Sequence, residues 1–220
     1  MSLRSPLRIF ARKKTTMGVI RRCWIWLKRF RHRCGYGVHS PFAFDFLTNV
    51  VYERGEYYAY RALREQFFSS SGWRNGHALK CCKFLFRLAN YVHPSVIRIY
   101  GGPVGRDVEE YLRAGCQSAL FRHEGIGCDG EGLCVSGDGR NELFYISADV
   151  PSMHWMALAD KVPTEHSVCL LCGIHRSPQV RRDWAGVKGH PRVTVSFDLY
   201  DYGILFFDSS KQNQHYIVNF

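Results

Sequence analysis

The stretch from Val96 to Gly115, VIRIYGGPVGRDVEEYLRAG, constrains the fold most strongly because strand, glycine turn and helix signals follow one another without a break. Val96 to Tyr100 is a short β-branched and aromatic run, which is typical of a buried strand. GGPVG at positions 101–105 allows a sharp turn, and residues 104–112 have helical spacing. The sequence therefore predicts a strand-turn-helix unit, from which α/β folds are built.

The glycine turn itself has two interpretations. A helix N-terminus presents unpaired N–H groups and a partial positive charge, and glycines remove the side chains that would keep a ligand away, so the turn fits a nucleotide-binding site. The third glycine of the dinucleotide fingerprint is absent, and glycine turns between strands and helices are common. An ordinary structural turn therefore stays open as the second interpretation.

The positive charge of the chain is concentrated at its N-terminal end. The chain carries a net charge of +11, and no acid precedes Asp45. The 11 cations before that residue are Arg4, Arg8, Arg12, Lys13, Lys14, Arg21, Arg22, Lys28, Arg29, Arg31 and Arg33. Subtracting them from the 30 cations leaves 19, which balance the 19 acids of the chain. We therefore expect a basic arm, residues 1–34, that acts separately from a neutral body.

Within the arm, residues 18–34 predict a basic amphipathic helix. Apolar residues recur at mostly three- and four-residue steps, and most arginines and lysines fall on the opposite side. Trp24 and Trp26 beside so many cations favour docking on an anionic membrane surface, with the tryptophans as anchors. Two alternatives stay open: the cations contact nucleic acid phosphates, or the apolar stripe packs on the body and the charges are solvated.

Residues 35–93 predict a helical region. Ser40 is a good N-cap and Pro41 suits the first helical position, so a helix is expected from there to about Glu53. Further helices are expected at Tyr57–Phe68 and Ala78–Val92, the last of which must end near Pro94.

From Val96 onward, strand and helix signals alternate, which predicts an α/β domain over residues 94–220 with a mainly parallel sheet. The expected strands are Val96–Tyr100, Ser118–His123, Leu133–Ser136, Leu143–Ser147, Val168–Leu171, Arg192–Phe197 and Gly203–Phe207. The expected helices are Val104–Ala114, Pro151–Val162 and Pro178–Val187. The last two strands are joined by DLYDY, which is too short for a parallel crossover, so we expect them to pair antiparallel.

The nine cysteines have no framework spacing, and the N-terminal apolar run is interrupted by arginines, so we expect reduced thiols in a cytoplasmic protein. Cys169 and Cys172 form a C-x-x-C, but residues three apart in a strand face opposite ways. We therefore predict no metal site. We expect these two thiols and those of Cys81 and Cys82 to be buried. No apolar run approaches the length of a membrane span, which leaves peripheral association at the inner membrane surface through the arm.

Two segments carry a resemblance to a known family. GYGVHSPFAFDFLTNVV near the start and GIHRSPQVRRDWAGVKGHPRVTVSFDLYDYGILFF near the end resemble a bacterial family of class I S-adenosylmethionine-dependent methyltransferases with a GVHSPF-type N-terminal motif. The resemblance covers about Arg31 to Phe220. It implies a Rossmann-like seven-stranded sheet, mainly parallel with an antiparallel last strand and preceded by N-terminal helices.

The resemblance also implies cofactor-binding positions for S-adenosylmethionine. Gly101 and Gly105 match the glycine loop of the family. Glu124, after the second strand, stands where an acid holds the ribose hydroxyls, and Asp138 is similar to a polar turn beside the adenine.

The chain departs from the family at other positions. The acid that precedes the glycines in relatives is replaced by Ile97, Arg98 and Ile99, and the aspartates that close two later strands have no counterpart, although Asp149 lies nearby. The connections that flank Leu133–Ser136 are too short for parallel crossovers. A catalytically inactive relative is therefore a second interpretation, with weak or lost cofactor binding.

If the acceptor must lose a proton, His39 and His175 are the candidate bases, although each precedes a helix cap, where a structural or surface histidine is equally at home. Arg176, Arg181 and Arg182 are candidates for binding an anionic acceptor or form a solvated helix face. The sequence thus predicts methyl transfer to an unknown acceptor, or a non-catalytic module that binds a membrane surface or a protein.

Overall fold

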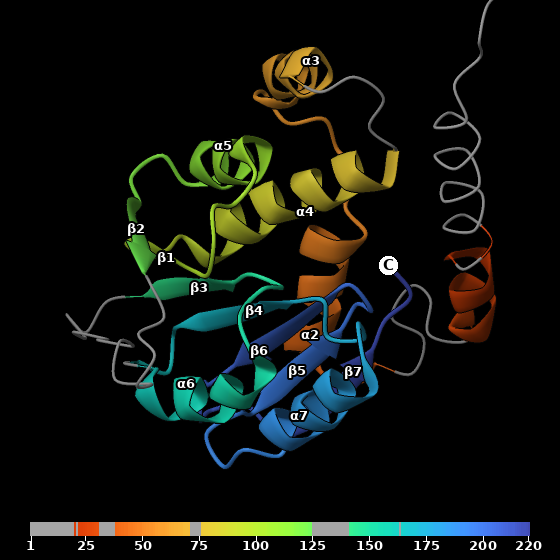
Figure 1. The fold of residues 1–220 in the computed structure, drawn as a ribbon, viewed down its shortest axis with the longest axis vertical. Coiled ribbons are helices and arrows are strands. Elements are labelled where there is room, and N and C mark those ends of the chain that lie inside the picture. Colours follow the sequence, from red (N-terminus) through yellow and green to blue (C-terminus); the bar gives the residue numbers. More distant parts are fainter. Residues whose placement is uncertain (1–19, 21, 31–37, 71–75, 125–140, 163) are drawn as a thin grey trace, which may run out of the picture.

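The computed structural model of the 220-residue chain describes residues 20, 22–30, 38–70, 76–124, 141–162 and 164–220. Its centre is a seven-stranded sheet with the strand order β2-β1-β3-β4-β6-β5-β7 (Figure 1). The predicted α/β, Rossmann-like class with a mainly parallel sheet and preceding helices is confirmed. The strands are β1 (Val96–Tyr100), β2 (Leu120–Glu124), β3 (Glu142–Ile146), β4 (Val168–Cys172), β5 (Val195–Asp198), β6 (Tyr202–Phe206) and β7 (Gln214–Ile217).

The antiparallel strand lies where the short DLYDY connection predicted it. β6 pairs antiparallel with both β4 and β5, so that Phe197 stands opposite Ile204. β7, which was not predicted, adds a parallel edge strand beside β5. Its four residues alternate between intermediate and exposed positions, which leaves little apolar pattern to detect. The predicted strand Leu133–Ser136 lies outside the described residues.

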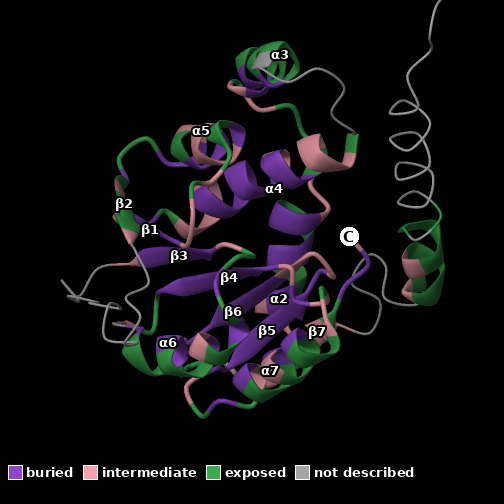
Figure 2. Cartoon of the chain, viewed as in Figure 1, coloured by how far each residue is buried: buried purple, intermediate pink, exposed green. Residues whose placement is uncertain are grey.

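Helices cover both faces of the sheet, and the buried residues lie between the layers (Figure 2). One face packs against α2 (Pro41–Phe46), the π-helical turn η2 (Leu47–Val51), α4 (Gly76–Val92) and α5 (Arg106–Gly115). The other packs against η3 (Ser152–His154), α6 (Trp155–Lys161) and α7 (Pro178–Lys188). The hydroxyl oxygens of Ser40 and Ser177 accept from the first-turn amides of α2 and α7, so the predicted cap-then-proline starts are confirmed.

The helix that begins at Pro41 ends sooner than the predicted Glu53. The buried guanidinium of Arg87 on α4 donates from Nε to the carbonyl of Val50 at 2.6 Å and from Nη2 to that of Val51 at 3.4 Å. These bonds satisfy carbonyls that a longer helix would have used. Beyond α4 and α5, α3 (Tyr60–Ser70) forms an outer layer that buries Tyr60 and Phe67.

The four cysteines that we expected to be buried are buried and free. Cys169 belongs to the core on one face of β4, and Cys172 to the core on the other face. The alternation of the strand therefore separates the two thiols of the C-x-x-C. Of the helices in the described residues, none has the length and apolar character that crossing a bilayer demands.

The contact between α4 and α5 gives a first prediction. A Cβ added to Gly115 would lie 2.3 Å from the carbonyl oxygen of Phe86 and 3.0 Å from the Cβ of Ala89, whereas one added to Gly186 on α7 would meet nothing within 4 Å. Gly115→Ala should therefore lower the free energy of unfolding by about 1 to 3 kcal/mol through overpacking.

The matched variant Gly186→Ala should raise the free energy of unfolding by about 0.5 to 1 kcal/mol, because alanine suits a helix better than glycine. Denaturant unfolding of the two variants measures both effects. Equal effects of the two substitutions would show that α4 and α5 do not pack as closely as described.

Candidate functional site at the carboxyl edge of the sheet

The candidate site lies where the parallel strands end. The chain leaves β1 for α5 on one face of the sheet and leaves β3 for α6 on the other. A crevice therefore opens between the carboxyl ends of β1 and β3, which is the usual ligand position in open α/β sheets. The glycine loop after β1 and the segment Ser147–Asp149 after β3 face each other there.

The side chain of Asp149 occupies the glycine loop. Its Oδ2 accepts the backbone N–H of Gly102 at 2.5 Å. Gly101 has a φ of +113°, which a residue with a Cβ rarely adopts, and an added Cβ would lie 2.7 Å from Oδ1 of Asp149. Hydrogen bonds from the Ser147 side chain and from the Gly102 amide lower the pKa of Asp149, so the carboxylate stays charged. Gly105 is the N-cap of α5, with open space around its Cα.

Glu124 lies at the carboxyl end of β2, as expected, but it is engaged by Arg98 of β1. Arg98 is 2% exposed and donates from Nη1 to Oε1 of Glu124 at 2.8 Å. It also donates from Nε and Nη2 to the two oxygens of the buried Glu142, at 2.7 and 3.2 Å. The hydrogen bonds to Glu142, the largest cause, raise the pKa of Arg98 above its ordinary value. Asp138, the fourth predicted cofactor residue, lies outside the described residues.

A cavity of about 430 Å³, here called the edge cavity, opens beside this crevice. Its volume is within the range of small-ligand sites. Its lining comes from the starts of α4 and α5, the ends of β3 and β4 and the start of β6, and includes His77, Cys81, Gly105, Ser147, Cys172 and Asp201. Oδ2 of Asp201 lies 2.9 Å from Nε2 of His77 and 3.0 Å from Nη1 of Arg22.

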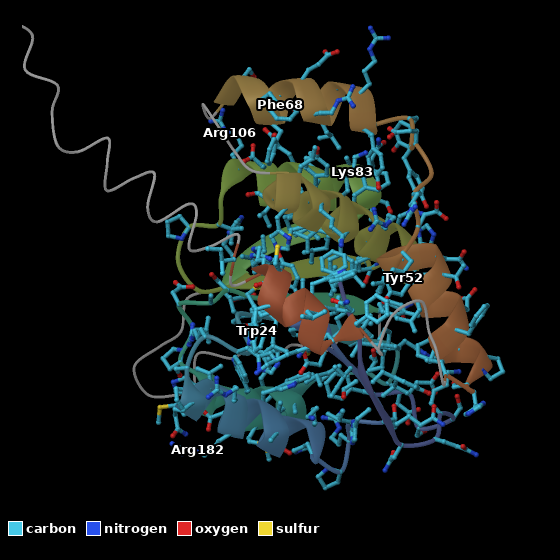
Figure 3. All side chains as sticks on the ribbon, turned by 90° about the vertical axis from the view of Figure 1, so that its right-hand side faces the viewer. Trp24, Tyr52, Phe68, Lys83, Arg106 and Arg182 are labelled. Atoms are coloured by element: carbon cyan, nitrogen blue, oxygen red, sulfur yellow. The ribbon has the colours of Figure 1, made fainter. Side chains whose placement is uncertain are left out.

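Arg22 belongs to a helix whose described residues are 20 and 22–28, here called the arm helix, which lies across the carboxyl edge. Nδ2 of Asn219 donates to the carbonyl of Trp26 at 3.1 Å. Two further cavities, of about 530 and 290 Å³, lie between this helix and the body, and Arg22 and Asp201 line both of them and the edge cavity. In Figure 3, the arm helix with Trp24 lies on the side of the molecule that faces the viewer.

The described residues of the arm also contact the body at a cluster around Asp198, at the end of β5. Arg29 donates from Nη2 to Oδ1 of Asp198 at 2.8 Å, and from Nη1 to the carbonyls of Asp198 and Val218 at 3.1 and 3.3 Å. Nε2 of His175 lies 2.7 Å from Oδ2 of Asp198. The ring of Tyr200 stacks on His175 at 5.0 Å and lies 5.1 Å from the Arg29 guanidinium. Tyr200 has a φ of +73°, which is unusual for a residue other than glycine.

The charge of this cluster is set by Asp198. Burial opposes its ionisation, but the hydrogen bond from His175 and the charge of Arg29 outweigh burial and lower the pKa of Asp198 to about 2. An ionised carboxylate only accepts hydrogen bonds, so the contact with Asp198 needs a proton on Nε2 of His175, a nitrogen that also lies 3.1 Å from Nη2 of Arg29. That nitrogen is therefore engaged with Asp198 rather than available as a base.

The two candidate bases are not brought together. His39 is exposed, and Phe42, on the turn that follows it, packs against Phe206 at 5.0 Å. Phe206 is the last residue of the antiparallel strand β6, so it lies at the edge where the parallel strands begin. His175 follows the carboxyl end of β4 and therefore lies at the opposite edge of the sheet. Of the candidate acceptor-binding arginines, Arg176 donates to the carbonyl of Val150 at 3.0 Å, and Arg181 and Arg182 are exposed.

Sequence reasoning missed the residues that bind the arm to the body. Arg29 counted only as one of many cations, and no pattern linked it to a residue 169 positions away. Asp198 and Asp201 were detectable, because the DLYDY link connects the end of one strand to the start of an antiparallel neighbour and therefore lies at the carboxyl edge. Acidic residues at that edge are candidate site residues in any α/β sheet.

The contacts of Arg29 predict how firmly the arm helix is held. Arg29→Ala removes charged hydrogen bonds to a buried carboxylate, which are worth about 1.5 to 3 kcal/mol, so the amides of residues 22–28 should exchange hydrogen at least about tenfold faster. Lys28→Ala is the matched control, because Lys28 is exposed and its ammonium lies over the Trp24 ring instead. Hydrogen-exchange mass spectrometry measures both, and equal rates in the two variants would contradict the described docking.

The lowered pKa of Asp198 predicts a pH dependence. A carboxyl group whose pKa is lower in the folded than in the unfolded protein stabilises the fold at pH values above its ordinary pKa. This contribution is lost as the pH falls toward the pKa of the folded state. A shift from 3.8 to about 2 corresponds to about 2 kcal/mol. The difference in unfolding free energy between wild type and Asp198→Asn should therefore be constant near neutral pH and shrink as the pH falls from 3.8 toward about 2. Denaturant unfolding over this range checks it, and a constant difference would contradict the assigned charge.

Comparison of the chain with protein-family models, with characterised proteins and with solved structures finds no match.

Proposed function

We propose that this chain is a non-catalytic relative of the S-adenosylmethionine-dependent methyltransferases, a binding module whose own side chains take the positions that a cofactor needs. The observation that carries the proposal is the Asp149 carboxylate on the backbone N–H of Gly102. The amino-acid part of S-adenosylmethionine ends in a carboxylate, and a glycine loop before a helix N-terminus is the natural place for such an anion. A second carboxylate already bound there repels it.

The engagement of Glu124 supports the same proposal. A carboxylate that holds two ribose hydroxyls must be able to turn toward the ribose. One oxygen of Glu124 accepts from the buried guanidinium of Arg98, whose charge it helps to neutralise. Turning Glu124 toward a ribose would weaken its ion pair with Arg98, whose side chain is 3% exposed, so the bonds to Glu142 would have to balance the buried charge. The ion pair of Glu124 with Arg98 therefore supports a site that no longer holds the cofactor.

Methyl transfer is the second candidate function, and the edge cavity is the observation that favours it. The cavity of about 430 Å³ adjoins Gly105 and Ser147, beside the position that the resemblance assigns to the cofactor. Methyl transfer asks little of a protein beyond holding the donor and the acceptor in line, so the engagement of His175 with Asp198 does not exclude it. Cofactor binding is therefore what separates the two candidates.

Calorimetric titration with S-adenosylhomocysteine tests the proposal. Wild type should give no heat at millimolar ligand, because the Asp149 carboxylate accepts the Gly102 N–H and repels a second carboxylate, and because Arg98 holds Glu124. Asp149→Ala frees the Gly102 N–H and removes the repelling charge, so it should bind at least about tenfold more tightly than wild type. Glu65→Ala is the control, because it also removes one negative charge but lies on α3 with its side chain 71% exposed.

Micromolar binding by the wild-type protein would overturn the non-catalytic proposal and favour the enzyme. If wild type binds and Asp149→Ala binds less well, Asp149 is part of the cofactor site rather than its occupant. A methyl-transfer assay would then be the next step.

A further inference from the structure

The arm helix has two distinct faces. Arg22, Ile25 and Arg29 face the body, where they line the cavities or pair with Asp198 and Asp201. Ile20, Trp24 and Leu27, spaced four and three residues apart, form a stripe on the other side of the helix, with Leu27 at its margin, where it also lines the cavity of about 530 Å³. These three side chains are 64%, 59% and 59% exposed. Arg22 and Arg29 thus pair with carboxylates of the body, while Ile20, Trp24 and Leu27 stay largely exposed.

This orientation is the reverse of an ordinary surface helix, which buries its apolar stripe. Ile20 and Trp24, at 64% and 59% exposed, do not pack on the body as the alternative interpretation of the stripe expects. Contiguous apolar residues on a surface mark an interaction site. Arg29 fixes the orientation, because its bonds to Asp198 leave the stripe no freedom to turn inward while the helix stays docked.

The charge around the stripe indicates an anionic partner. The chain carries 11 cations and no acid before Asp45. Subtracting Arg22 and Arg29, which pair with Asp201 and Asp198, leaves nine cations in this segment. An apolar, tryptophan-bearing stripe within a basic segment combines the two attractions that hold a helix in the boundary layer of an anionic membrane. The ammonium of Lys28 lies 5.1 Å from the Trp24 ring, at the margin of the stripe.

We propose that the arm helix docks on anionic membrane surfaces through Ile20, Trp24 and Leu27, with Arg29 and Asp198 holding the body against it. This names the partner of the binding module proposed above and rests on that proposal. A membrane fits better than nucleic acid, because phosphate contact needs cations on the outer face and two of the described cations of this segment face inward. The docked body brings the carboxyl edge close to the lipid.

Sedimentation of the full-length chain with vesicles tests the proposal. It should bind vesicles of equal parts phosphatidylcholine and phosphatidylglycerol, bind pure phosphatidylcholine far less, and weaken between about 0.1 M and 1 M salt. Trp24→Ala combined with Leu27→Ala should weaken binding at least about tenfold, because both side chains lose apolar burial. Phe68→Ala is the matched control, since Phe68 is 54% exposed on α3, and it should bind like wild type.

Several results would overturn the proposal: no vesicle binding by wild type, equal binding of both vesicle types, or a double variant that binds like wild type with an unchanged circular dichroism spectrum.

A DNA duplex that displaces the chain from vesicles and binds the double variant equally well would assign the arm to nucleic acid instead. Self-association that the double variant abolishes, without vesicle binding, would assign the stripe to a second copy of the chain. The titration with S-adenosylhomocysteine is independent of all these results, so failure of the module proposal is distinguishable from failure of membrane docking.

Discussion

A guanidinium buried between two carboxylates joins the first three strands of the sheet. Arg98 of β1 reaches Glu124 of β2 on one side and Glu142 of β3 on the other. Such a network costs desolvation energy, and it persists only because each charge has hydrogen-bonded partners. It links the neighbouring strands β2, β1 and β3 and holds Glu124, the residue that the resemblance assigns to a ribose. The stability of this half of the fold and the state of its ligand site therefore depend on the same residue.

The sequence predicted most of the elements because their signals are local. Alternation, helix caps and the length of the DLYDY link need only neighbouring residues, and they located six described strands and the helices on both faces. The glycine loop was also found, since glycines 101 and 105 are visible in the sequence. Its occupant was not predicted, because the direction of the Asp149 side chain depends on where β3 ends and on an amide 47 residues away. The docking of Arg29 was likewise hidden, since it joins residues from opposite ends of the chain.

The arm and the crevice are connected through the carboxyl edge. Arg22 and Asp201 line all three cavities at that edge, so a movement of the arm helix changes the shape of each of them. The exposed stripe and the hydrogen-bonded glycine loop are the two observations on which our proposal of a surface-binding module rests. A fold of this type supports many functions, and here the site residues, rather than the sheet, carry the argument.

The backbone conformation of Tyr200 is linked to the docking of the arm through the contact of its ring with Arg29. Its left-handed backbone conformation costs about 1 kcal/mol or more, and glycine or asparagine would adopt it more easily. The tyrosine ring, however, stacks on His175 and lies against Arg29. In related chains we therefore expect these two positions to change together. A lineage that loses the arginine becomes free to place glycine at the turn, whereas a lineage that keeps the arginine retains the strained aromatic residue.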